Sequence, residues 1–180
     1  MRLSLALAAL VCTLSACAPR PSSPDFTLTD QAGRPWTLSD QRGHVVVLNF
    51  GFTHCEDTCP LTLAKLVRVV RSLGPRAADV TIAFVSVDPA RDTPAVMRRY
   101  VAKFDTTGRL VGLTGSPAAV TRTEDAYHVW AQRVPGPRSG NYDVAHSAVI
   151  YFIDRSGAQR KVLDDDTPEA ALGGTLRELL

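Results

Sequence analysis

Two cysteines in the segment 51–60 are the residues of this chain best suited to chemistry. Three residues separate Cys55 from Cys59, and the pair lies between an apolar stretch and a segment with helical periodicity. Two neighbouring thiols outside the cytosol can form an inert disulfide, exchange a disulfide with another molecule, or bind a soft metal ion. The rest of the sequence has to decide among these three kinds of chemistry.

The position of Cys59 favours an active role over an inert disulfide. It precedes Pro60, just as a hydroxyl residue precedes proline in Thr93-Pro94, Ser116-Pro117 and Thr167-Pro168. A hydroxyl N-cap followed by proline at the first helical position is typical of a helix start. We therefore expect Cys59 to cap a helix, with backbone N–H groups and the positive end of the helix dipole lowering its pKa.

A histidine could complete a site with the two sulfurs, and His146 is the strongest choice. It lies directly before an apolar strand expected to start near Ala148, whose entrance can approach the loop after the strand expected at 45–50. The alternative is that His146 is merely a polar loop residue. His44 precedes a strand and His128 is expected late in a helix, while His54 adjoins Cys55 and could serve as a fourth or replacement ligand.

The elements that must position these side chains alternate as in an α/β fold. Residues 26–29 and 35–38 alternate apolar and polar types around a turn, which predicts an N-terminal β-hairpin. Apolar runs at 45–50 and 80–87 flank a helical pattern at 61–73, so this strand–helix–strand order predicts a parallel pair. Further helices are expected at 95–104, 118–130 and 169–180, and further strands at 110–113, 148–153 and 158–163. We expect a central mixed sheet flanked by helices.

The first residues predict export from the cytosol. One basic residue, Arg2, precedes the apolar stretch 3–16, which is typical of a signal peptide and too short to span a bilayer. Its end, Leu14-Ser15-Ala16-Cys17, resembles a bacterial lipobox, which implies cleavage before Cys17 and lipidation of its sulfur. Cys12 would leave with the signal peptide at 1–16. The proline-rich residues 17–24 would form a flexible tether, with one domain at 25–180.

Chain length and charge limit the number of domains and the classes of partner that we expect. Removing 16 of the 180 residues leaves 164, enough for one domain with a sizeable core, and lowers the formal net charge from +2 to +1. No basic cluster with interleaved aromatic residues occurs, so we expect no nucleic-acid partner. Trp36 and Trp130 are expected to be packing residues, and 88–93 a mainly structural turn and helix cap.

Taken together, the motifs resemble the Sco/SenC family. The similarity lies in five features that occur in the family's order: 51–60, 85–94, 113–115, His146, and 151–157. The resemblance implies a thioredoxin-like fold and copper binding outside the cytosol through Cys55, Cys59 and His146. It also implies a role in assembling the dinuclear copper A centre of cytochrome c oxidase.

The resemblance also implies partners and a location. The copper A-bearing oxidase subunit is the expected partner, beside another periplasmic copper chaperone or a thiol reductant. The location would be extracytoplasmic, on the periplasmic side in a bacterium, through the lipid on Cys17. Two thiolates and one imidazole suit Cu(I), with Cu(II) as a second state, whereas structural zinc takes four protein ligands. Ala145 stands where the family commonly has aspartate, and Asp143 could compensate for the missing carboxylate. Glu56 stands where the family often has proline.

Two other functions use the same cysteines. A thiol–disulfide oxidoreductase would reduce cysteines of an oxidase subunit or of another extracytoplasmic protein, with Cys55 and Cys59 as catalytic residues. A thiol peroxidase would need one activated cysteine near a threonine and an arginine, but Thr53 does not have the peroxiredoxin spacing from Cys55. Because a copper carrier transfers a metal rather than turning over a substrate, we expect a metal chaperone more than an enzyme.

Overall fold

The computed structural model describes residues 22–136 and 141–180. The expected signal peptide at 1–16, Cys12, Cys17 and most of the expected tether lie outside the described residues. In both described ranges, no helix has the length and hydropathy needed to cross a membrane.

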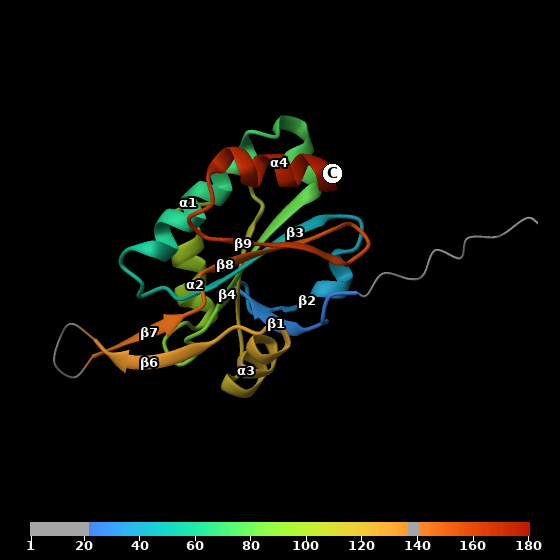
Figure 1. Ribbon diagram of the computed structural model, residues 1–180. Coiled ribbons are helices and arrows are strands. Elements are labelled where there is room, and N and C mark those ends of the chain that lie inside the picture. Colours follow the sequence, from blue (N-terminus) through green and yellow to red (C-terminus); the bar gives the residue numbers. More distant parts are fainter. Residues whose placement is uncertain (1–21, 137–140) are drawn as a thin grey trace, which may run out of the picture.

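A seven-stranded mixed sheet forms the centre of the molecule (Figure 1). Its order is β2-β1-β5-β4-β3-β8-β9, with β3 and β4 parallel, β4 and β5 parallel, and β8 antiparallel to β3. The strands are β1 (Thr27–Asp30), β2 (Pro35–Thr37), β3 (Val45–Gly51), β4 (Val80–Ser86), β5 (Leu110–Thr114), β8 (Val149–Ile153) and β9 (Gln159–Asp164). The predicted N-terminal hairpin is β1–β2, and the predicted parallel pair is β3–β4.

Both faces of the sheet are covered, because β3 and β4 carry apolar side chains on each face. Val45 and Val47 of β3 lie in one core with residues of α1 (Thr58–Arg71), α2 (Pro94–Val101) and α4 (Glu169–Leu179). Val46 and Leu48 point to the other face, where α3 (Pro117–Ala126) packs. Figure 1 shows α3 on the opposite side of the sheet from α1 and α4. Two short 3-10 helices, Leu38–Gln41 and Gly74–Asp79, complete the connections.

Two of the predicted helix caps are confirmed and one is wrong. The Thr93 hydroxyl accepts the Val96 N–H at 3.4 Å, and the Ser116 hydroxyl accepts the Ala119 N–H at 3.2 Å. Thr167 makes no such bond: Pro168 itself is the N-cap of α4, without a side-chain cap. The helix starts one residue later than the hydroxyl–proline pattern predicts.

The second hairpin was not predicted from the sequence. A helix was expected over 118–130, but α3 ends at Ala126, and His128 takes a left-handed φ of 56° that turns the chain away. The chain then forms β6 (Ala131–Pro135) and β7 (Tyr142–His146), an antiparallel pair outside the main sheet. Trp130, expected to be a packing residue, lies at the start of this hairpin with 56% of its surface exposed.

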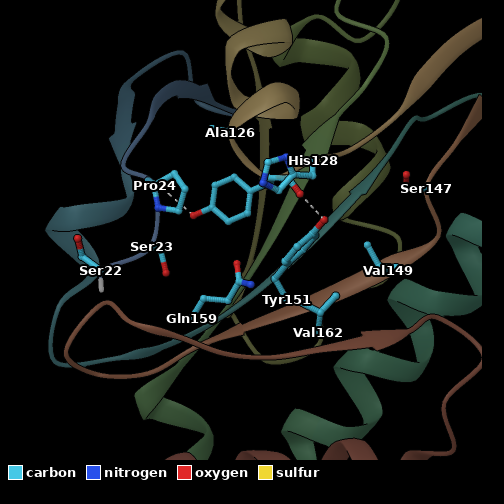
Figure 2. A pocket seen from close by; sticks show the side chains of 11 residues that line it. Ser22, Ser23, Pro24, Ala126, His128, Ser147, Val149, Tyr151, Gln159 and Val162 are labelled. Atoms are coloured by element: carbon cyan, nitrogen blue, oxygen red, sulfur yellow. Dashed lines mark hydrogen bonds between the residues drawn. The ribbon is translucent and has the colours of Figure 1, made fainter. Parts of the chain in front are cut away.

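The N-terminal segment packs onto the domain earlier than expected. Ser23, placed in the tether by the sequence, is buried and donates its N–H to the Gly157 carbonyl at 2.8 Å. The Tyr127 hydroxyl donates to the Pro24 carbonyl at 2.9 Å, and the Tyr151 hydroxyl donates to the Tyr127 carbonyl at 2.8 Å (Figure 2). These groups line an open hollow of about 560 Å³ that contains neither Cys55 nor Cys59.

Candidate metal centre

The two cysteines lie at the junction between the central strand β3 and the helix α1. β3 ends at Gly51, and a loop carries Cys55 before α1 begins at Thr58. Gly51 leaves room for the site, since a Cβ built there would lie 2.9 Å from the Cys59 Sγ and 2.6 Å from a ring carbon of Phe84. The end of β3 is therefore tightly packed against the Cys59 sulfur.

The two thiols lie side by side and are both free. Cys59 is buried and Cys55 is half-buried. The Cys59 N–H donates to the Cys55 Sγ at 3.4 Å. Hydrogen bonds from the Cys59 thiol, and then from the backbone N–H groups of Cys59, Asp57 and Thr58, lower the pKa of Cys55 to about 5 against its desolvation.

This arrangement reverses the predicted roles of the thiols. The hydrogen bond between the two thiols, followed by burial, raises the pKa of Cys59 instead of lowering it. The reason is the helix start: Asp57 is the N-cap, so Cys59 is the second helical residue and its side chain turns inward. The sulfur that faces the free N–H groups of the first turn belongs to Cys55, which lies outside the helix.

His146 lies beside the buried thiol, as the sequence predicted. It is the last residue of β7, and its Nε2 is 3.8 Å from the Cys59 Sγ. Its Nδ1 lies 3.0 Å from the Ser147 carbonyl oxygen, which can only accept, so Nδ1 is the donor of this pair and Nε2 is the ring nitrogen that faces the Cys59 sulfur. The Phe52 ring packs edge-on against the imidazole at a centroid distance of 5.8 Å.

The other histidines are placed differently. His54 is exposed and its Nδ1 lies 3.1 Å from the Thr53 hydroxyl and 3.9 Å from the Asp92 carboxylate. It shares a hollow of about 320 Å³ with Cys55 and Asp143. His44 precedes β3, and His128 lines the separate hollow of Figure 2. Over residues 22–136 and 141–180, no three His, Cys, Asp or Glu side chains are already gathered as a metal site.

A family model described as SCO1/SenC matches residues 16–180. The chain belongs to the SCO1/SenC family. It is 44% identical over 135 residues to the mitochondrial SCO2 homolog of Bos taurus, covering 74% of this chain and 50% of that protein. The chain thus spans about half the length of the curated relatives it matches.

Solved members of the SCO1/SenC family share the fold. Bradyrhizobium japonicum ScoI with copper bound superposes with a TM-score of 0.80 and 36% identity, over 89% of this chain and all of that one. A SCO1/SenC family lipoprotein from Bacillus anthracis gives a TM-score of 0.75 and 28% identity, over 88% and 94% of the two chains. The fold is thioredoxin-like, as the resemblance implied.

The two departures from the family's usual residues can now be located. Ala145 lies in β7 opposite Gln132, next to His146, and offers no carboxylate to the imidazole. Asp143 lines the hollow with Cys55, but one of its carboxylate oxygens accepts the Val144 N–H at 2.8 Å. The Ser147 carbonyl is instead the hydrogen-bond partner of the imidazole Nδ1. Glu56 is exposed in the loop between the cysteines.

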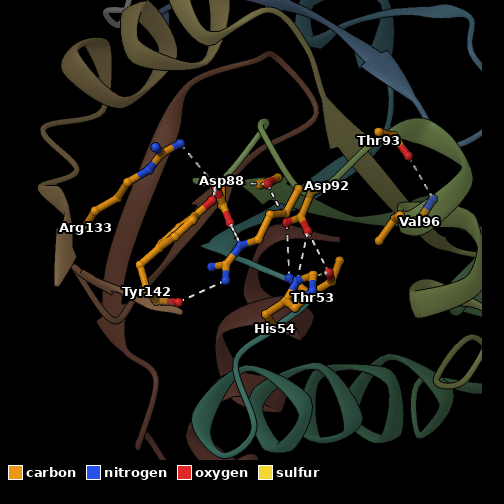
Figure 3. A network of polar contacts seen from close by, with 10 residues as sticks. Thr53, His54, Asp88, Asp92, Thr93, Val96, Arg133 and Tyr142 are labelled. Carbon is orange, nitrogen blue, oxygen red and sulfur yellow. Dashed lines mark hydrogen bonds and ion pairs between the residues drawn. The ribbon is translucent and has the colours of Figure 1, made fainter. Parts of the chain in front are cut away.

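A polar network missed from the sequence adjoins the site (Figure 3). The segment 88–93 was expected to be mainly a turn and a helix cap, and Thr93 does cap α2. Asp88 and Asp92 are also buried, and their partners come from the cysteine loop and from the β6–β7 hairpin. The sequence shows two acids in one short turn, but it shows neither their burial nor their partners.

Proposed function

We propose that this chain binds one copper ion through Cys55, Cys59 and His146 and delivers it during assembly of the copper A centre of cytochrome c oxidase. The observation that carries the proposal is the 3.8 Å separation between the Cys59 Sγ and the His146 Nε2. The similar ScoI of Bradyrhizobium japonicum, which has copper bound, supports the choice of metal.

The donor set fits copper in chemistry and spacing. First-row metals bind cysteine sulfur at about 2.3 Å and histidine nitrogen at about 2.0–2.1 Å, so a trigonal ion would separate the two atoms by about 3.8 Å. Two thiolates make a soft site that favours Cu(I), and the imidazole also suits Cu(II). Copper is the cargo here, so a site with few ligands and a half-buried edge at Cys55 suits both loading and release.

The protonation states of the two cysteines bear on how this site would bind a metal. At neutral pH Cys55 is already a thiolate, because its pKa is lowered to about 5. Cys59 keeps its proton, and metal binding would release it, since a thiolate is the metal ligand. The Nε2 atom of His146 faces Cys59 because Nδ1 is held by the Ser147 carbonyl.

Titration of the reduced protein with Cu(I), in competition with a chromophoric chelator, tests the ligand set. We expect about one Cu(I) per chain and a loss of affinity of about 100-fold for His146→Ala, as for Cys55→Ser and Cys59→Ser. His128→Ala is the matched control, because His128 is exposed and lines the other hollow. If His146→Ala binds copper like the wild type, the ligand assignment is wrong.

The partner and the anchor belong to the same proposal. We expect transfer to the copper A-bearing oxidase subunit, loading by another copper chaperone, and re-reduction by a thiol reductant. Lipidation of Cys17 would hold the domain on the periplasmic face of a membrane, and the similarity to the Bacillus anthracis lipoprotein supports this. Mass spectrometry of the membrane-extracted protein tests the anchor, because Cys17→Ser should abolish both the lipid mass and the membrane fraction.

Thiol–disulfide exchange is the second function that an observation favours. The Cys55 thiolate is half-buried and activated, so it could attack a partner disulfide and form a mixed disulfide. Cys59, once deprotonated, would then attack the Cys55 sulfur, which releases the partner as a dithiol and leaves a Cys55–Cys59 disulfide. His146→Ala separates the two functions: a reductase should keep most of its disulfide-reducing rate, whereas a copper donor should lose transfer.

A further inference from the structure

The hairpin that carries His146 is not part of the main sheet. β6 and β7 pair only with each other, and an isolated two-stranded hairpin has marginal stability. Its buried anchor is Val144, which lies in the core on the α3 side of the sheet. Apolar burial is not directional, so it cannot by itself fix how the hairpin presents His146 to the sulfurs. Directional contacts must do this.

Arg91 supplies such contacts to the first residue of β7. Its guanidinium lies 3.7 Å from the centroid of the Tyr142 ring, and its Nη1 donates to the Tyr142 carbonyl at 2.9 Å. A planar guanidinium can stack and donate at the same time, which a lysine cannot. These contacts fix both the ring and the backbone of Tyr142, four residues before His146 (Figure 3).

Asp88 holds the arginine in place. It is 1% exposed; one carboxylate oxygen accepts the Arg91 Nε–H, and the other accepts the Tyr142 hydroxyl at 2.7 Å. Arg133 of β6 lies 3.7 Å from the same carboxylate and 4.6 Å from the Tyr142 ring centroid. Asp88 therefore ties both strands of the hairpin to the turn after β4, and the two arginines offset the cost of burying its charge.

A second route leads from Arg91 to the imidazole through one aromatic ring. The guanidinium lies 5.8 Å from the centroid of the Phe52 ring, and this ring is the one that packs edge-on against His146. On the other side of the turn, Asp92 accepts the Thr53 N–H at 3.1 Å and the Thr53 hydroxyl at 2.6 Å. One turn thus contacts the residues just before Cys55 and the strand that ends in His146.

We propose that Arg91, held by Asp88, is a positioning residue that sets the imidazole of His146 against the two sulfurs. The inference rests on the proposed function, because it gives the imidazole a role in copper binding. Asp92 fixes the cysteine side of the site through Thr53. The turn 88–92 is then a latch between two parts of the chain that are distant in sequence.

A double-mutant cycle between Arg91→Gln and His146→Ala tests this latch by Cu(I) affinity. Arg91→Gln should weaken binding about 10-fold in the wild type and less than about 2-fold when His146 is already alanine. Equal losses in both backgrounds would overturn the latch and leave Arg91 a structural role only. Arg99→Gln, an exposed arginine of α2, is the matched control and should change neither.

Two milder variants keep the inference testable if Arg91→Gln folds poorly. Tyr142→Phe removes the hydroxyl that donates to Asp88. It should weaken Cu(I) binding more in the wild type than in His146→Ala. Arg91→Lys keeps the positive charge but loses the planar guanidinium that stacks on Tyr142. Its Cu(I) affinity should therefore fall between those of the wild type and Arg91→Gln. A wild-type Cu(I) affinity for Arg91→Lys would overturn positioning by the guanidinium plane.

A metal-free readout complements the affinities. In the reduced protein without copper, the ring signals of His146 should broaden or split in Arg91→Gln and stay sharp in Arg99→Gln. Unchanged ring signals would overturn the latch. The proposed function fails separately: if His146→Ala alone leaves the Cu(I) affinity unchanged, the ligand assignment is wrong whatever Arg91 does.

Discussion

Gly51→Ala is the sharpest test of how closely the strand end is fitted to the cysteine site. An alanine Cβ at this position would lie 2.9 Å from the Cys59 Sγ and 2.6 Å from a Phe84 ring carbon. Gly51 does not have a positive φ, so the substitution adds no backbone strain and its effect is steric. Overpacking of this kind costs roughly 1–3 kcal/mol of stability.

The same clash should reach the metal site. Ordinary carbon–sulfur contact would require the sulfur to withdraw by about 0.5 Å, whereas metal–ligand distances tolerate about 0.2 Å. We therefore expect Gly51→Ala to bind Cu(I) about 10-fold more weakly, which corresponds to about 1.4 kcal/mol. The assay is competition with a chromophoric Cu(I) chelator, with urea unfolding of the same samples.

Gly112→Ala is the matched control for overpacking without a displaced sulfur. Its Cβ would lie 2.9 Å from the Val101 Cγ1 and 3.1 Å from the Met97 Cε, in the core beneath α2. Its stability should fall by a similar amount, while its Cu(I) affinity should stay within about 2-fold of the wild type. Equal affinity losses in the two variants would refute the steric argument, since they would trace to global destabilisation.

Two further predictions concern the thiols and the core. The pKa of Cys55 is lowered to about 5, below its ordinary value of about 8.5, so its thiolate stabilises the folded state fully above about pH 8.5, and this contribution is lost as the pH falls from there through 5. Iodoacetamide alkylation of Cys55, located by mass spectrometry, should reach its plateau above about pH 6, and a midpoint near the ordinary value would contradict the assignment. In urea unfolding, Leu63→Ala should cost about 2–5 kcal/mol because Leu63 is fully buried in α1, whereas Arg68→Ala, which breaks an exposed pair with Glu169, should cost less than about 1 kcal/mol.

The order of elements could be predicted because most of them carry a strong local pattern. β3 and β4 are mostly apolar runs, and both are buried between layers of helices. The hairpin β6–β7 has no such run: of the strand residues 131–135 and 142–146 only Val144 is buried, and the adjacent polar residues Gln132 and Arg133 break the alternation of β6. Its strands are held by contacts across the molecule, which local periodicity does not record.

The proximity of Cys55, Cys59 and His146 was predictable from the sequence, but their electrostatics were not. The spacing of Cys55 and Cys59 and the place of His146 before a strand pointed to the right neighbours. The pKa order was wrong because it depends on which residue begins α1, and a shift of two residues moves the free N–H groups from one sulfur to the other. Helix boundaries are the part of a fold that sequence patterns define least sharply.

With the proposed ligand set, copper binding and disulfide formation exclude one another because both use the Cys59 sulfur. Cys59 contacts both Cys55 and His146, so it is the shared member of the thiol pair and of the sulfur–imidazole pair. A disulfide would bring the two sulfurs to about 2.05 Å and remove the thiolates that a metal needs. Copper can then load only the reduced chain, and oxidation would eject it or block its entry. A thiol reductant acting on this pair would therefore control loading whichever of the two functions dominates.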